Sequence, residues 1–174
     1  IKKIMNSKEN IVFLGMMGSG KSSIGSLISK ELNLDFFDTD QVIEKKLNLK
    51  IPQIFQNEGE KFFREFEEKI TLQILKNRNS VVSLGGGTFL NKNVRNEILK
   101  NHNSFWLKWN SETILKRVQN NPKRPIAFNL TNFELMKLIK KRSIIYSKAL
   151  YSINCDGLSK KQIVNKIKKI HESN

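Results

Sequence analysis

The segment Gly15-Met16-Met17-Gly18-Ser19-Gly20-Lys21-Ser22 has residue types and a spacing suited to binding phosphate groups. It fits the pattern G-x-x-x-x-G-K-[ST], in which glycines let backbone N–H groups curl around phosphate oxygens at the positive end of the following helix. We expect Lys21 to reach the β- and γ-phosphates of a nucleotide and Ser22 to contact Mg²⁺. The alternative is a glycine-rich turn with a solvated lysine, but a match of this length between a strand and a helix rarely arises by chance.

Two carboxylates, Asp38 and Asp40, stand at the end of a short apolar segment, 16 and 18 positions after Ser22. At the end of a strand both could face one cleft, where one could hold Mg²⁺ through water and the other could orient or deprotonate a hydroxyl. We assign Asp38, which is nearer the strand, to Mg²⁺ and Asp40 to the acceptor. The alternative is that Asp40 only caps the helix that begins near Val42.

Three adjacent glycines, Gly85–Gly87, follow another apolar segment. Consecutive glycines are costly in conformational entropy, so their presence favours a site where the backbone meets a small ligand. A simple strand-to-loop turn is the alternative.

Arginine is the rarer cation here: the 31 basic residues comprise 25 lysines and six arginines, beside 20 asparagines and 20 isoleucines. Such an excess of Lys, Asn and Ile is typical of AT-rich coding. An arginine retained against that pressure is a candidate for the planar, bidentate grip of a carboxylate or phosphate that lysine cannot give. Arg64, three residues before Glu67, Arg124, between two prolines, and Arg142 are such candidates, although a surface ion pair or a solvated basic face would also explain them.

The net charge of +15 invites a nucleic-acid interpretation, but the basic excess lies entirely after residue 60 and no aromatic residues interleave with the lysines. One cysteine and two histidines exclude a disulfide framework and a His/Cys metal cluster. No apolar run approaches the roughly 18 residues that span a bilayer, and no secretory signal is visible. We therefore expect a cytoplasmic protein with no nucleic-acid or membrane partner. We also expect it to be a monomer, although none of these observations bears on its oligomeric state.

Short apolar segments alternate with helical patterns along the chain. Strands are predicted at 11–14, 35–38, 80–84, 104–109 and 151–155. Helices are predicted at 21–32, 42–47, 51–76 (as one helix or two), 93–100, 111–118, 131–150 and 160–170. Alternation of this kind predicts an α/β three-layer sandwich, a parallel sheet covered on both faces, with ligands at the carboxyl ends of the strands. The length of 174 residues fits a single domain.

From about Asn10 to Asp156 the chain resembles the shikimate kinase family. The resemblance rests on the segment 15–22, Phe37-Asp38-Thr39-Asp40, Glu58-Gly59-Glu60 with Phe63-Arg64-Glu65-Phe66-Glu67, Gly85–Gly87, Arg124-Pro125, and Arg142 with Tyr146. It implies a P-loop fold like that of nucleoside monophosphate kinases, with five parallel strands. It also implies transfer of the ATP γ-phosphoryl to the 3-hydroxyl of shikimate, with Mg²⁺ as cofactor.

The resemblance implies a role for each matching residue. The nucleotide would be held by Gly18, Ser19, Gly20, Lys21, Ser22, Ser23, Arg117 beside adenine, and Arg124; the metal by Ser22 and Asp38; and shikimate by Asp40, Arg64, Gly86, Gly87 and Arg142. Lys21, Asp40 and Arg124 would be catalytic, with a substrate-binding helical region at about 40–76 and a lid loop at about 119–131. The loop 155–160 lacks the proline often found after the fifth strand, and the segment 126–131 matches the family's lid poorly.

Two alternatives remain open from the residues alone. The first is another small-molecule P-loop kinase, such as a gluconate kinase, because two arginines favour a carboxylate without naming it. The second is an ATP-binding nucleic-acid protein that uses the basic carboxyl-terminal half of the chain.

Overall fold

A five-stranded parallel sheet forms the centre of the computed structural model, which describes residues 10–119 and 130–173. Its strands are β1 (Ile11–Leu14), β2 (Asp35–Asp38), β3 (Ser80–Ser83), β4 (Asn103–Lys108) and β5 (Tyr151–Asn154). Their order across the sheet is β2-β3-β1-β4-β5, and every neighbouring pair is parallel. β1 is central because its four apolar residues are buried on both sides.

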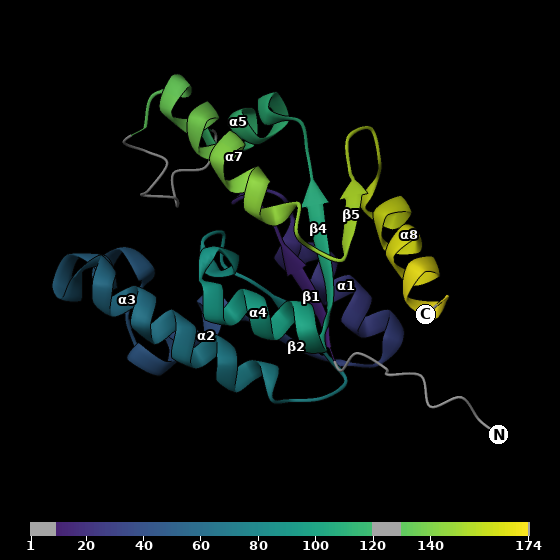
Figure 1. Cartoon of the computed structure of the whole chain (residues 1–174), viewed down its shortest axis with the longest axis horizontal. Coiled ribbons are helices and arrows are strands. Elements are labelled where there is room, and N and C mark those ends of the chain that lie inside the picture. Colours follow the sequence, from purple (N-terminus) through teal and green to yellow (C-terminus); the bar gives the residue numbers. More distant parts are fainter. Residues whose placement is uncertain (1–9, 120–129, 174) are drawn as a thin grey trace.

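Helices cover both faces of this sheet (Figure 1). They are α1 (Lys21–Leu32), α2 (Thr39–Leu47), α3 (Ile51–Leu75), α4 (Lys92–Asn101), α5 (Ser111–Gln119), α7 (Asn132–Tyr146) and α8 (Lys160–Glu172), with a short 3₁₀ helix η1 (Thr88–Leu90). α1 and α8 lie on one face, and α2, α3, α4, α5 and α7 lie on the other. The predicted three-layer α/β sandwich is confirmed.

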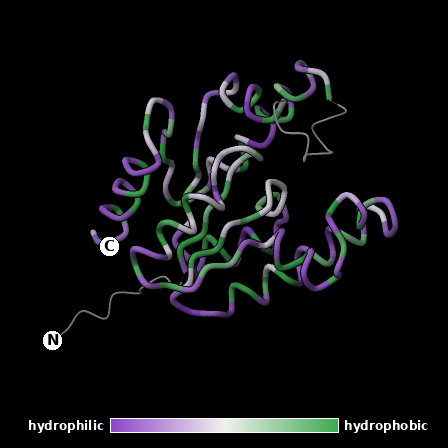
Figure 2. Tube along the Cα trace, turned by 180° about the vertical axis from the view of Figure 1, so that it is seen from behind, coloured by the Kyte–Doolittle hydropathy of each residue, from purple (hydrophilic) through white to green (hydrophobic). Residues whose placement is uncertain are grey.

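The core divides into two clusters because successive strand side chains point to opposite faces. Ile11 and Phe13 of β1 pack towards α1 and α8, whereas Val12 and Leu14 pack towards α3, α4, α5 and α7. In Figure 2 the hydrophobic colour is accordingly concentrated along the central strands and the inward sides of the helices. No helix in the described ranges is long and apolar enough to cross a membrane.

The observed elements follow the predicted ones closely, with three differences of physical interest. α2 begins at Thr39, three residues earlier than predicted, because the Asp38 side chain caps it. α3 is kinked where Gly59 adopts φ 84°. η1, which was not predicted, follows the three glycines. A capping box of Thr131 and Glu134 begins α7.

Candidate active site

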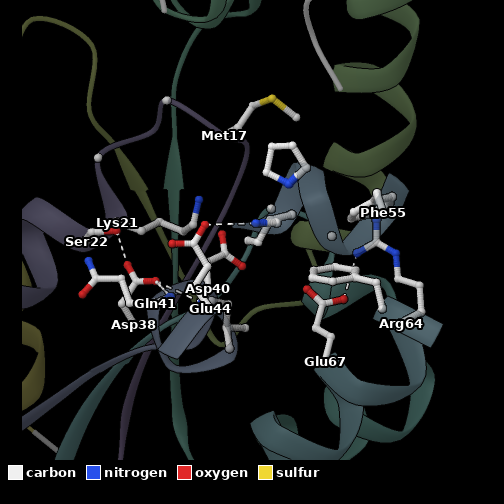
Figure 3. A pocket seen from close by; sticks show the side chains of 18 of the residues that line it. Met17, Lys21, Ser22, Asp38, Asp40, Gln41, Glu44, Phe55, Arg64 and Glu67 are labelled. Atoms are coloured by element: carbon white, nitrogen blue, oxygen red, sulfur yellow. Dashed lines mark hydrogen bonds and ion pairs between the residues drawn. The ribbon is translucent and has the colours of Figure 1, made fainter. Parts of the chain in front are cut away.

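A cavity of about 780 Å³ opens at the carboxyl ends of β1, β2 and β3, where the topology of a parallel sheet predicts a ligand site. It brings together segments far apart in the sequence, from the loop after β1 to helix α7 (Figure 3). Most of the residues predicted to bind a ligand line it: Gly18, Gly20, Lys21, Ser22, Ser23, Asp38, Asp40, Arg64, Gly86, Gly87 and Arg142.

The loop between β1 and α1 forms one end of the cavity. Gly20 is the N-cap of α1 with φ 87°, a left-handed conformation that favours glycine, and no side chain caps the helix. The first N–H groups of α1 are therefore left for a ligand. Lys21 is 8% exposed, and its Nζ donates to the carbonyl oxygens of Gly15 at 3.0 Å and Met16 at 2.9 Å, which folds its ammonium back over the loop.

Ser22 and Asp38 meet at the foot of this loop. The Ser22 hydroxyl donates to Asp38 Oδ2, and Ser22 Oγ lies 3.5 Å from Ser83 Oγ. A hydroxyl and a carboxylate oxygen in contact suit Mg²⁺, which takes one or two protein oxygens and completes its shell with phosphates and water. This donor set fits the predicted metal site, and none of the described residues forms a larger acidic or His/Cys cluster for a metal.

Asp38, not Asp40, caps helix α2. Its Oδ1 accepts from the backbone N–H groups of Asp40 at 3.1 Å and Gln41 at 3.2 Å. The alternative that Asp40 is only the helix cap is therefore wrong, because that task is taken by the preceding carboxylate. The side chain of Asp40 instead lines the cavity, between the phosphate loop and Arg64 (Figure 3).

The surroundings of Asp40 disfavour its charged form. Burial is the main cause that raises its pKa, from 3.8 to about 7, and the carboxylates of Asp38 and Glu67 add to the shift while the Lys21 ammonium opposes it. A carboxyl group with a pKa near 7 is suited to exchange a proton with a hydroxyl at neutral pH.

Arg64 is oriented from α3 by its neighbours. Its Nη1 donates to Glu67 Oε2 at 2.8 Å, and Nε and Nη2 lie 3.4 Å from Glu60 Oε1. Its guanidinium carbon lies 5.1 Å from the ring centre of Phe63. Glu67 is itself 3% exposed and its Oε1 accepts from the Thr88 hydroxyl at 2.7 Å. Glu67 thus orients Arg64, and Thr88 of η1 holds Glu67 from the other side.

The glycine segment leaves room for these side chains. A Cβ on Gly85 would lie 2.6 Å from Asp40 Oδ1, 2.9 Å from Thr88 Oγ1 and 3.0 Å from Glu67 Oε1. A Cβ on Gly87 would lie 2.7 Å from Arg64 Nη1. The turn therefore needs glycine so that the backbone can approach the side chains, and Gly85, to which the sequence assigned no role of its own, is the most confined.

Arg142 enters the cavity from α7. It is 8% exposed, so the solvated basic face expected from the Lys140-Lys141-Arg142 run is wrong for this residue. Within the described ranges its Nε has no hydrogen-bond partner and no carboxylate pairs with its guanidinium. One turn later, the Tyr146 hydroxyl donates to the Gly86 carbonyl, which fixes α7 to the glycine segment. Burial raises the pKa of Tyr146 to about 12, so it stays a donor.

The two remaining predicted nucleotide contacts in the described residues lie in a second, smaller cavity of about 350 Å³, which Gly18 and Gly20 of the phosphate loop also line. Ser19 and Arg117 line it together with Trp109, Leu158 and Lys160. Arg124, predicted in a lid, lies outside the described residues, as does most of the loop 119–131.

Sequence reasoning missed the apolar wall of the main cavity. Ile51, Pro52 and Phe55, at the start of α3, line it, together with Glu44 of α2. Glu44 Oε1 accepts from the Ile51 N–H at 3.1 Å and so joins the two helices. A proline in the first turn of a helix signals where that helix begins, but no sequence signal shows which way the following aromatic ring faces.

Comparison with known proteins agrees with this geometry. The family model described as shikimate kinase matches residues 17–172. The shikimate kinase of Bartonella henselae is 40% identical over 155 residues, which cover 87% of this chain and 74% of that protein. The shikimate kinase of Acinetobacter baumannii, solved in complex with shikimate, has a TM-score of 0.89 at 28% identity and covers 97% of this chain and 96% of its own.

The rival family is more distant. A solved gluconokinase from Sinorhizobium meliloti 1021 shares 14% identity with a TM-score of 0.60, covering 96% of this chain and 95% of its own, which shows a common fold alone. The family-model match, the relatives at about 40% identity and the superposition over nearly the whole length agree, and the chain belongs to the shikimate kinase family.

Proposed function

We propose that the chain transfers the γ-phosphoryl group of ATP to the 3-hydroxyl of shikimate, through the residues of the main cavity. The observation that carries the assignment of roles is that one cavity holds the phosphate loop, Asp40 and two arginines. The cavity thereby offers a phosphate-binding loop to ATP, and a proton acceptor and two carboxylate-binding arginines to the acceptor substrate.

The donor end of the proposed reaction depends on the phosphate loop. Backbone N–H groups at the start of α1 hydrogen-bond the phosphates, and Lys21 leaves its two carbonyl contacts to reach the β- and γ-phosphates. Ser22 and Asp38 hold Mg²⁺, and Arg117 flanks the adenine. The ion, when bound, neutralises charge on the phosphate oxygens.

The acceptor end depends on side chains. Asp40 accepts a hydrogen bond from the 3-hydroxyl and takes its proton as the 3-oxygen bonds to the γ-phosphorus and the bond from that phosphorus to the bridging oxygen of ADP breaks. A pKa of about 7 supports this role. Arg142 and Arg64 bind the carboxylate of shikimate. The buried guanidinium of Arg142, without an acidic partner in the described ranges, supports this because a buried cation needs a counter-ion.

We further propose that the enzyme works as a monomer in the cytoplasm, where ATP is available. Arg124 is proposed to contact the phosphates.

The test is an ADP-release assay with shikimate, gluconate and nucleoside monophosphates offered as separate acceptors. We expect turnover with shikimate alone, and product analysis by ³¹P NMR should show a phosphate ester at the 3-position. Turnover with gluconate and none with shikimate would overturn the proposal.

A further inference from the structure

Trp109, directly after β4, joins the phosphate loop to the second cavity. It stands at the cavity wall with Arg117, and its indole N–H donates to the carbonyl oxygen of Ser19 at 2.9 Å. This contact spans 90 positions in the sequence. Trp109 is only half-buried, so water could also reach its indole N–H. Packing of the ring alone therefore does not require the bond to the loop carbonyl.

Arg117 lies over the same ring. Its guanidinium carbon is 3.7 Å from the centre of the Trp109 ring, and its Nη1 donates to the carbonyl oxygen of Gly18 at 3.3 Å. A guanidinium stacked on an indole loses much of the freedom of a long side chain, and its other face remains for a ligand. Trp109 and Arg117 thus hold two successive carbonyls of the phosphate loop.

Holding a carbonyl also orients the next N–H group. In a planar trans peptide the C=O and the following N–H point in opposite directions. The bond from Trp109 to the Ser19 carbonyl therefore turns the Gly20 N–H away from the Trp109 side chain, and Gly20 lies where the two cavities meet, because it lines both. An N–H group at this position, at the start of α1, is suited to bind phosphate oxygens.

We propose that Trp109 is a positioning residue for the nucleotide: it orients the phosphate loop through the Ser19 carbonyl and fixes Arg117 as a stacking wall for the base. This proposal rests on the proposed function, because it assumes that the two cavities hold the phosphates and the base of one nucleotide. Trp109 acts through Ser19 and Arg117 and touches no reacting atom.

Two substitutions separate the two actions. Trp109→Phe keeps an aromatic face for Arg117 and removes the N–H donor. Trp109→Leu removes both. Loss of one hydrogen bond weakens binding by about threefold to tenfold, and loss of the stacked cation as well by about ten- to thirtyfold.

Isothermal calorimetry with ADP measures these losses without an acceptor. We expect ADP to bind Trp109→Phe more weakly than the wild type, and Trp109→Leu more weakly still. KM for ATP should rise in parallel, and KM for shikimate should stay unchanged. If the role of Trp109 were merely structural, the substitutions would instead lower the thermal midpoint and weaken the binding of both substrates together. Normal ADP affinity in both variants would overturn the role of Trp109 while leaving shikimate turnover, and so the proposed function, intact.

Fluorescence gives a second readout, because the chain has two tryptophans, Trp106 and Trp109. In Trp106→Phe, where Trp109 is the remaining tryptophan, ADP should change the emission more strongly than in Trp109→Phe. An unchanged emission of Trp106→Phe at saturating ADP would contradict the proposal. A wild-type chain that does not bind ADP at all would overturn the proposed function itself, and the role of Trp109 with it.

Discussion

The two ends of the main cavity are built in different ways. The phosphate end comes from one continuous segment, residues 15–23, and presents mainly backbone groups at the start of α1. The acceptor end is assembled from α2, α3, the glycine segment after β3, and α7, and it depends on contacts between side chains. A backbone site is encoded by a local pattern, whereas a side-chain site is encoded by the fold as a whole.

This difference predicts different responses to substitution. At the phosphate end most contacts survive a change of side chain, and Lys21 is the exception. At the acceptor end the removal or addition of a single atom should lower activity with shikimate, because Asp40, Glu67 and Thr88 all lie within 3.0 Å of where a Cβ on Gly85 would stand. The variants below test whether the two ends can be damaged separately.

Asp40→Asn should have the largest effect. Asparagine keeps the shape but cannot take a proton, so we expect kcat to fall by about 10²–10⁴ with ADP binding unchanged. Because Asp38 is the helix cap, the loss cannot be assigned to an unfolded α2. Steady-state kinetics and calorimetry on the one variant check this, and a normal kcat would remove Asp40 from the chemistry.

The pKa of Asp40 adds a pH signature. The wild-type kcat should rise with pH through about 7 as Asp40 ionises, and the profile of Asp40→Asn should lack that step. Between pH 3.8 and about 7 the folded chain binds more protons at Asp40 than the unfolded chain, so this group's contribution to the free energy of unfolding falls as pH rises. The thermal midpoint of Asp40→Asn minus that of the wild type should therefore be larger at pH 8 than at pH 5.

Lys21→Met damages the opposite end. Methionine keeps the length but removes the charge from the β- and γ-phosphates, and loss of such transition-state stabilisation lowers kcat by about 10²–10³. Shikimate binding should be unaffected, which equilibrium binding of shikimate alone would measure. A folded variant with near-normal turnover would contradict the assignment of the loop.

These two ends also mark how far the sequence could predict the site. The placement of Lys21 and Ser22 on the cavity wall could be predicted because a contiguous motif fixes its own geometry. The sequence marked Gly85 as one of three adjacent glycines, but its close confinement could not be predicted, because Asp40 of α2 and Glu67 of α3 converge on this one backbone position. The strands were predicted to within a residue at each end because buried apolar runs bounded by glycine or polar residues are strong local signals.

Gly85→Ala should confine its damage to the acceptor end. Its φ does not require glycine, so alanine fits the backbone, but the new Cβ would collide with Asp40 Oδ1 at 2.6 Å. We expect kcat/KM for shikimate to fall by about tenfold to a hundredfold, since a small displacement of a catalytic group is costly. Calorimetry should show unchanged ADP binding; equal losses for both substrates would mean that the two ends are not separable.

Arg142→Lys tests the carboxylate clamp. Lysine keeps the charge but loses the planar two-pronged grip, so KM for shikimate should rise by about tenfold while KM for ATP changes little. Lys141→Ala, an exposed neighbour on the same helix, is the control. If the affinity for ATP falls instead, Arg142 belongs to the phosphate end.

The burial of Arg142 shows where local sequence patterns fail. Its basic run is typical of a solvated helix face, yet the helix is rotated so that Arg142 and Tyr146, one turn apart, face the glycine segment. That rotation is set by the packing of Leu135 and Ile139 against the core, which is a property of the whole fold. The apolar wall at Phe55 escaped prediction for the same reason.

Thr88→Val should have the smallest effect and is the most specific test of side-chain support. Thr88 is fully buried, and its hydroxyl donates to Glu67 Oε1, whose other oxygen holds Arg64. Valine has nearly the same shape but no donor, so Glu67 loses one partner and Arg64 is held less firmly. Because Thr88 acts through two other residues, we expect KM for shikimate to rise by only about threefold, with kcat and ADP binding unchanged. Thr88→Ser retains the hydroxyl and should restore most of the affinity, whereas equal KM values for the valine and serine variants would show that the hydroxyl does not support the acceptor end.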